Sequence, residues 1–225
     1  MRSCVAGLLG AGLLVPVLAA AQVPLQQEQS TRLRDRYRTP QNSAKLDDSV
    51  RKLRSDDTDD RLEGIRGLGE VNDAKATEHL IGAASDPDPR VRIKAIDTLG
   101  HIKAKDATTL LVQQLFMRDT DLGTKRHILA SLGKIGDPHA TAPIRDFLAR
   151  DVEHAARGNA IFALGEIGDP AALPTLEAIA RDSSDEILRG LAQGAVRKIR
   201  ERPAPPVAVP ALAGERRLEG PAPTP

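Results

Sequence analysis

The sequence predicts an all-α fold in which about five helical hairpins stack into an α-solenoid, followed by a disordered Pro-rich tail. The first supporting observation is internal repetition: the dipeptide Leu-Gly recurs at Leu68, Leu99, Leu132 and Leu164, at intervals of 31, 33 and 32 residues. The second is the scarcity of aromatic residues, with no Trp, one Tyr and three Phe. A core of Leu, Ile, Val and Ala suits thin, stacked helices better than a β-sandwich, whose strands favour aromatic and β-branched residues.

Each of these Leu residues lies at the centre of a predicted helix, the first of its hairpin. Apolar residues stand three positions before it and three positions after it, a spacing that places all three on one helix face. The residue directly before it is small, which allows two helices to approach closely. In chain order, these three sets are Ile65, Ile96, Leu129 and Ile161; Val71, Ile102, Ile135 and Ile167; and Gly67, Thr98, Ser131 and Ala163.

A second apolar stripe follows in every copy and predicts the second helix of the hairpin. Ala stands eight positions after each central Leu, and a Leu or Ile stands twelve positions after it. Between the two helices, Gly136-Asp137-Pro138 and Gly168-Asp169-Pro170 are turn sequences, because Asp caps the next helix and Pro is tolerated at its first position. Neither helix can bury its stripe alone, so the hairpins must stack.

The two ends of the repeat region depart from the pattern. A fifth copy centred on Val196 has Arg197 where the others have Gly, and Gln193 where they have an aliphatic residue, as suits a terminal repeat that faces water. At the other end, residues 43–53 predict a lone second helix that covers the stack. We therefore assign residues 43–201 to the repeat domain.

The first 21 residues predict a signal peptide. Arg2 is followed by an almost unbroken apolar run that ends in Ala19-Ala20-Ala21, a pattern typical of cleavage by signal peptidase. The alternative is an uncleaved anchor, although the run barely reaches the ~20 residues that a membrane helix needs. A linker over residues 22–42 and a disordered Pro- and Ala-rich tail over residues 202–225 complete the expected organisation. We expect a periplasmic or secreted protein, attached to a membrane only if the first segment is retained.

The sequence predicts no catalytic, cofactor-binding or metal-binding residues. Cys4, the only cysteine, lies in the predicted signal peptide, and no two of the five His have the i, i+4 spacing of a metal-binding pair. No nucleotide-binding loop or nucleophile elbow occurs. The 32 Lys and Arg nearly balance the 31 Asp and Glu, whereas a nucleic-acid-binding protein needs a basic excess. We interpret the acidic run over residues 56–60 as a helix cap; the alternative is a calcium loop.

The segment from Ser85 to Gly100 carries a family resemblance. Together with the Gly-Asp-Pro turns and the later Ala and Leu positions, it resembles the short HEAT-like repeat of the phycobilisome lyase type. The resemblance covers about residues 43–200 and implies stacked helical hairpins. Most members of that family look like protein-binding scaffolds, and a few take part in attaching or removing bilin chromophores. A shared fold does not by itself carry a shared chemistry.

The resemblance also implies a structural ladder between neighbouring repeats. The basic residues of the ladder, seven positions before each central residue, are Arg61, Arg92, Lys125, Arg157 and Arg189. Its acidic residues, five positions after the central Leu in three copies, are Asp73, Asp137 and Asp169. In HEAT-like stacks such residues bond one repeat to the next. The alternative is a basic stripe that receives an acidic partner protein.

The expected partner-binding surface consists of outward-facing residues of the second helices. These are Glu78, Thr109, Gln113, Phe116, Asp146 and Glu177. Phe116 and Met117 fall where the 33-residue interval adds length; the alternative is that both pack into the turn.

The sequence therefore predicts an exported, non-enzymatic scaffold or adaptor that uses its repeat surface to bind a protein. It predicts no cofactor and no nucleic-acid partner. Two alternatives remain open: a subunit of an enzyme such as a chromophore lyase, and a membrane-anchored regulatory lid.

Overall fold

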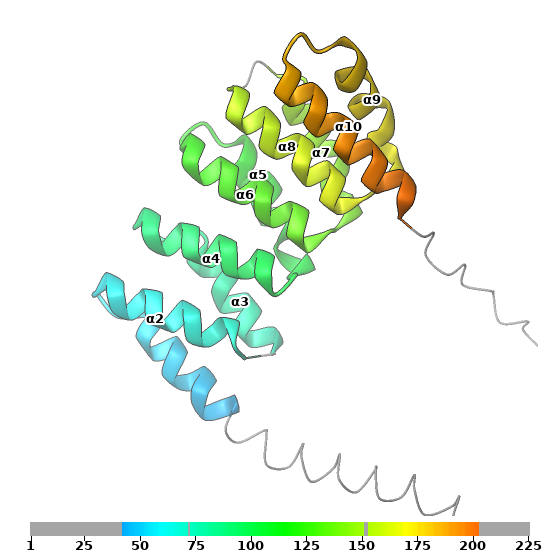
Figure 1. The fold of residues 1–225 in the computed structure, drawn as a ribbon. Coiled ribbons are helices and arrows are strands. Elements are labelled where there is room, and N and C mark those ends of the chain that lie inside the picture. The colour runs from blue at the N-terminus through cyan, green and yellow to red at the C-terminus, as the bar shows by residue number, and fades with distance from the viewer. Residues whose placement is uncertain (1–41, 72, 151–152, 203–225) are drawn as a thin grey trace, which may run out of the picture. The chain divides into compact units, whose positions relative to one another are not determined.

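A computed structural model describes residues 42–71, 73–150 and 153–202 of the chain. Within these ranges the chain forms ten α-helices and no strand, so the predicted all-α fold is confirmed. The chain divides into two compact units, residues 1–99 and residues 100–225, and each is described by itself (Figure 1). The predicted signal peptide, nearly all of the predicted linker and the tail after Arg202 lie outside the described residues.

The first unit begins with a helix over residues 42–53. It continues with α2 (Thr58–Gly69), α3 (Ala74–Ala83) and most of α4 (Pro89–His101). The side chain of Asp57 caps α2 by accepting the backbone N–H groups of Asp59 and Asp60, at 2.7 and 3.3 Å. The acidic run over residues 56–60 therefore caps a helix, as we interpreted it.

The second unit is built from two layers of helices. One layer contains α6 (Leu122–Ile135), α8 (His154–Ile167) and α10 (Glu186–Glu201), which lie side by side (Figure 1). The other contains α5 (Thr108–Phe116), α7 (Thr141–Leu148) and α9 (Leu173–Asp182). Short 3-10 turns at Lys105–Ala107, Pro138–Ala140 and Pro170–Ala172 lead into these three helices. First helices thus stack on first helices, as the repeat period predicts.

The repeat register correctly identifies the core. In all four Leu-Gly copies, the central Leu and the residues at positions −3, +8 and +12 have no exposed surface. The aliphatic residues at these positions are Ile65, Leu68, Leu80, Ile96, Leu99, Leu111, Leu129, Leu132, Ile144, Ile161, Leu164 and Leu176. Full burial of such a side chain contributes about 1.5–3 kcal/mol. Each helix buries one apolar stripe against its neighbours, and this burial accounts for the stacking of the hairpins.

The turns inside the hairpins follow from glycine and aspartate chemistry. Gly136 and Gly168 end α6 and α8 in the left-handed conformation, at φ of 70° and 75°. Asp137 and Asp169 then accept backbone N–H groups of the following 3-10 turns. The second copy lacks both residue types, and its Lys103 takes the left-handed conformation instead, at φ of 55°. A residue with a Cβ is strained there.

The Gly after each central Leu marks a close approach between neighbouring first helices. A Cβ added at Gly133 would lie 3.1 Å from Ala163 Cα, and one added at Gly165 would lie 2.9 Å from Ala195 Cβ. The contacted residue is in both cases the small residue before the next central residue. The Gly of one repeat and the small residue of the next therefore face each other where two neighbouring first helices meet.

Candidate functional site

The predicted partner-binding residues lie on the helices where the sequence placed them, but on both units. Glu78 is exposed on α3 of the first unit. In the second unit, Thr109 and Gln113 are exposed on α5 and Asp146 is exposed on α7. Glu177 on α9 is half-buried, and its carboxylate accepts a hydrogen bond of 2.6 Å from Arg200 of α10.

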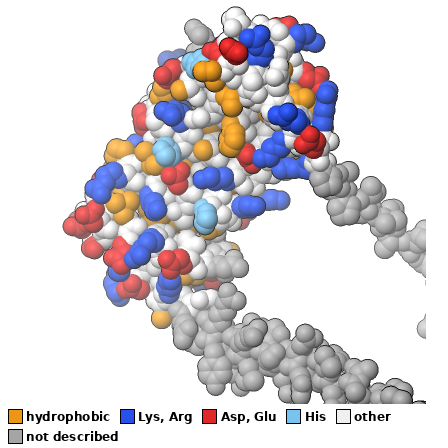
Figure 2. Space-filling view, viewed as in Figure 1, with side chains coloured by type: hydrophobic (Ala, Val, Ile, Leu, Met, Phe, Trp, Pro, Cys, Tyr) orange, Lys and Arg blue, Asp and Glu red, His pale blue; other side chains and the backbone are white. Residues whose placement is uncertain are grey.

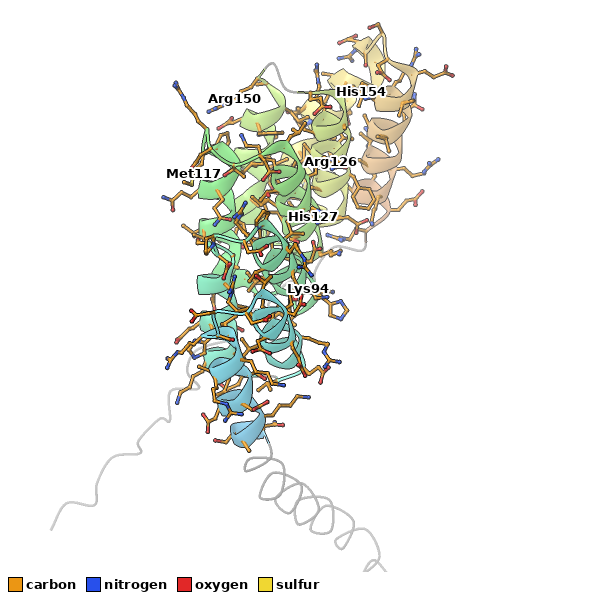
Figure 3. The ribbon with its side chains drawn as sticks, turned by 90° about the vertical axis from the view of Figure 1, so that its left-hand side faces the viewer. Lys94, Met117, Arg126, His127, Arg150 and His154 are labelled. Atoms are coloured by element: carbon orange, nitrogen blue, oxygen red, sulfur yellow. The ribbon has the colours of Figure 1, made fainter. Side chains whose placement is uncertain are left out.

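An aromatic cluster joins α5 to the end of α7. The Phe116 ring is half-buried and meets the buried Phe147 ring edge-on, with 6.3 Å between centroids and 71° between planes. The guanidinium of Arg150 lies over the Phe116 ring, 4.5 Å from its centroid. Met117, beside Phe116, is 42% exposed. Figure 3 shows Met117 and Arg150 on the same edge of the second unit. We name Phe116, Met117, Phe147 and Arg150 the aromatic cluster.

This arrangement combines both interpretations of Phe116. Its ring packs against Phe147, as the packing alternative expects, yet part of the ring and much of Met117 remain exposed. Aromatic and Arg side chains dominate the energetics of protein interfaces, and a cation–π pair contributes about 0.5–1 kcal/mol at an exposed site. Sequence reasoning did not find Arg150, because 34 residues separate it from Phe116 and only the fold brings them together.

In the first unit, two of the predicted ladder residues bind backbone carbonyls. Arg61 donates to the carbonyl oxygens of Ser55 and Asp56, at 3.2 and 3.0 Å. Its guanidinium also binds both carboxylate oxygens of Asp86, at 3.1 and 3.3 Å. Arg92 repeats the backbone pattern by donating to the carbonyl oxygens of Asp86 and Pro87, at 2.8 and 3.3 Å. The structure therefore pairs Arg61 with Asp86 in the loop before α4, not with a ladder Asp.

The other ladder residues have different surroundings. Lys125, Arg157 and Arg189 are half-buried. Arg61 and Arg92 each bind the carbonyls six and five positions before them. For Arg157, the corresponding carbonyls belong to residues 151 and 152, which lie outside the described residues. The three predicted Asp partners are helix caps, since Asp73, Asp137 and Asp169 each accept the backbone N–H two residues ahead.

A second exposed feature is an apolar groove between α8 and α10. Three large apolar side chains line it: Phe162 (53% exposed), Ile187 (67%) and Leu191 (37%). The groove has a volume of about 580 Å³. Figure 2 shows hydrophobic side chains gathered on the face that α8 and α10 present in Figure 1. The ion pair of Lys198 with Glu166, at 2.5 Å, borders it. We name this feature the α8–α10 groove.

A polar pocket at the start of α10 contains the His154–Asp185 pair. Asp185 caps α10 by accepting the N–H groups of Ile187 and Leu188, at 2.8 and 3.1 Å, and also bonds His154 Nε2. The pKa of Asp185 lies below its ordinary value chiefly because the carboxylate accepts the N–H of Leu188. Partial burial raises this pKa, and the bond to His154 lowers it further. The Ser183 hydroxyl contacts only the backbone of Asp185. Among the described residues, the pair therefore serves as a helix cap.

Two structural features associated with metal and membrane sites are absent from the part of the chain that the structure describes. It holds no group of three or more His, Cys, Asp or Glu side chains arranged to bind a metal ion. Over residues 42–71, 73–150 and 153–202, no helix is long and apolar enough to span a bilayer.

Comparison with known proteins identifies the repeat. The family model that describes HEAT repeats matches residues 48–122 and 109–197, more than half of the chain. No curated protein matches the chain in sequence. A similar solved structure is the complex of CpcE and CpcF of phycocyanin lyase from Nostoc sp. PCC7120, with a TM-score of 0.58 and 20% identity. The match covers 70% of this chain and 65% of that chain, less than two thirds of its length. At this identity the likeness shows the fold.

The same match corrects the prediction that the chain is not an enzyme, which was wrong. A chain with this fold occurs in a lyase complex. The absence of a catalytic motif from one chain does not establish the absence of catalysis, because an enzyme assembled from two chains can divide its catalytic groups between them. The matched repeats, the helical hairpins and their buried register all agree, and the chain belongs to the HEAT repeat family.

Proposed function

We propose that this chain is the protein-binding subunit of an enzyme assembly of the phycocyanin-lyase kind, and that it holds a second protein through the exposed face of α5 and α7. The fold supports the proposal, because the similar structure is a complex of two proteins of such a lyase. The assembled pair, and not this chain alone, carries the reaction.

The aromatic cluster is the single observation on which the proposed surface rests. Phe116 and Arg150 are the residue types that anchor interfaces, and Met117 adds an adaptable apolar contact. Exposed Gln113 lies one turn before Phe116, and exposed Asp146 directly precedes Phe147. These polar groups surround the cluster, as the polar rim of an interface surrounds its apolar centre.

The first test measures partner binding by matched surface variants. The tagged chain is used to isolate its partner from source cells; the partner is identified by mass spectrometry, produced separately and titrated against the pure chain. Met117→Lys combined with Arg150→Glu should weaken the 1:1 complex at least 10-fold, because both exposed side chains belong to the proposed surface. Loss of the contact between Arg150 and Phe116 should cost the fold only about 0.5–1 kcal/mol. Ile187→Lys, at a more exposed apolar side chain on α10, is the control. If the control variant loses the partner and the double variant keeps it, the proposed surface is wrong.

The second test addresses the reaction. The reconstituted pair is incubated with free bilin and the apo form of phycocyanin, and covalent attachment is read as bilin fluorescence after denaturing electrophoresis. We expect labelling by the pair and not by either chain alone. A stable pair that gives no labelling would exclude this reaction class and leave partner binding intact.

We also propose that the mature protein is exported and begins near Gln22. The support is the apolar run that ends in Ala19-Ala20-Ala21. Mass measurement of protein recovered from the cell envelope tests it, and a mass that includes residues 1–21 would favour the anchored alternative.

A further inference from the structure

The α8–α10 groove breaks the repeat pattern in a specific way. In the earlier copies, the positions in register with its three apolar side chains are polar, charged or small. For Phe162 these residues are Arg66, Asp97 and Ala130; for Leu191 they are Glu63, Lys94, His127 and Asn159; and for Ile187 they are Asp59, Arg90, Gly123 and Ala155. At these three positions, the first helices of the earlier copies therefore carry no large apolar side chain. Apolar side chains gathered at one place on a surface indicate a binding site.

The floor of the groove is open to a closely approaching chain. Gly190 and Gly194 line it from α10, and a Cβ added at either one would meet nothing within 4 Å. The groove is small, because three apolar side chains are far fewer than the roughly 20–30 residues that each side of a stable dimer contributes. Its size instead fits one extended segment.

The chain itself supplies such a segment directly after α10. Residues 203–214 contain no charged and no polar side chain, only Pro, Ala, Val, Leu and Gly. In a polyproline helix, which has three residues per turn, the positions of Pro203, Pro206, Val209 and Leu212 share one edge. Proline-rich segments of this kind bind aromatic-lined grooves at low entropic cost, because their conformation is preformed.

The start of this segment is fixed beside the groove. Arg202 donates to the carbonyl oxygens of Glu166, at 2.9 Å, and Ile167, at the end of α8. Glu166 also borders the groove. From Arg202 back to Ile187, α10 is about 22 Å long at 1.5 Å per residue. The ten residues from Pro203 to Leu212 span about 31 Å as a polyproline helix. That length covers the groove and leaves enough chain to reverse direction.

We propose that residues 203–212 fold back along α10 and occupy the α8–α10 groove of their own chain. Val209 and Leu212 then contact Phe162, Ile187 and Leu191, and the polyproline backbone lies over Gly190 and Gly194. The tail thereby becomes part of the repeat domain and covers the apolar side chains of the α8–α10 groove. This inference is independent of the function proposed for the aromatic cluster.

A single fluorescent reporter tests this in the full chain. The protein contains no Trp, so Phe162→Trp places one reporter in the groove. In the otherwise unchanged chain, we expect blue-shifted emission and slow quenching by acrylamide. Adding Val209→Asp and Leu212→Asp should move the emission to the red and raise the quenching constant at least 2-fold. Ala222→Asp with Thr224→Asp places the same two charges farther along the tail and should change neither reading.

Three results would overturn the proposal. The first is an exposed reporter in the chain with an unaltered tail. The second is a protected reporter that the Val209 and Leu212 substitutions do not release. The third is protection that disappears on dilution, because that result would assign the groove to a second copy of the chain. Circular dichroism of every variant confirms that the helical fold is retained.

Discussion

The substitution Gly64→Ala tests how closely α2 packs against the helix over residues 42–53. Gly64 lies in α2 and is buried against the helix over residues 42–53. A Cβ at this position would lie 2.7 Å from the carbonyl oxygen of Ser49 and 2.8 Å from the backbone nitrogen of Leu53. Both contacted atoms belong to helical backbone, which cannot rotate aside as a flexible side chain does. The whole neighbouring helix must therefore move.

The size of the effect follows from these distances. Comfortable separations between non-bonded heavy atoms are about 3.5–4.0 Å, so the neighbouring helix must retreat by about 1 Å. Overpacking of this kind costs about 1–3 kcal/mol. Replacing Gly by Ala inside a helix returns up to about 1 kcal/mol through helix propensity. We expect a net loss of about 1–2 kcal/mol in the free energy of unfolding, or about 2–8 °C in melting temperature.

Urea unfolding followed by far-UV circular dichroism measures this loss. Gly82→Ala in α3 is the matched control, because a Cβ there would meet nothing within 4 Å. The control should raise the free energy of unfolding by up to about 1 kcal/mol. If both substitutions stabilise the protein, the close approach of α2 and the helix over residues 42–53 is wrong.

Three further substitutions test the turns, the ladder and the cap of α10. Lys103→Gly should stabilise the fold by about 0.5–1 kcal/mol in urea unfolding, because it removes the strain of a left-handed residue with a Cβ; a loss of stability would contradict the strain. Arg61→Ala should cost about 1–3 kcal/mol in the same assay, since it removes the guanidinium from Asp86, which keeps the N–H of Asp88, and from two backbone carbonyls. An unchanged stability, with partner binding lost, would instead support a docking role for the basic residues. The pKa of Asp185 is lowered from its ordinary value of 3.8, chiefly by the Leu188 N–H, so the ionised form stabilises the fold. This stabilisation is fully present when the pH is above the ordinary pKa of 3.8, and it is lost as the pH falls through the lowered pKa of the folded protein. Asp185→Ala should therefore be less stable than the unaltered chain at neutral pH and should match it in strong acid, whereas a pH-independent difference would exclude the carboxylate as the cause.

The sequence predicts the core well because burial follows a fixed period. A hydrophobic stripe with a spacing of three or four residues has only one way to face inward. The positions at −3, 0, +8 and +12 are accordingly buried in all four copies. The turn at Gly136 is equally predictable, because a left-handed residue followed by Asp-Pro ends one helix and begins the next.

Contacts between distant residues are predicted poorly, because they depend on the angle at which helices cross. The pairing of Arg61 with Asp86 depends on the path of the loop before α4. From the sequence alone, Asp73 was an equally good candidate for the partner of Arg61. The contact between Arg150 and Phe116 needed the end of α7 to reach the end of α5. Neither geometry is encoded by spacing along the chain.

Departures from the repeat are the sequence feature that identifies both exposed surfaces. Phe116 stands at a register position where the other copies carry Ser85, Ala149 and Arg181, and Phe162 stands where earlier copies carry Arg66, Asp97 and Ala130. A solenoid needs the same few residues in each copy in order to stack, so selection for folding alone leaves the outward positions polar. An aromatic side chain at such a position gains nothing from the repeat core and has to gain its stabilisation elsewhere. At Phe116 the contacts are Phe147 and Arg150, whereas at Phe162 the described residues leave about half of the side chain exposed. The first surface is therefore partly satisfied within the fold, and the second is the one that we propose residues 203–212 cover.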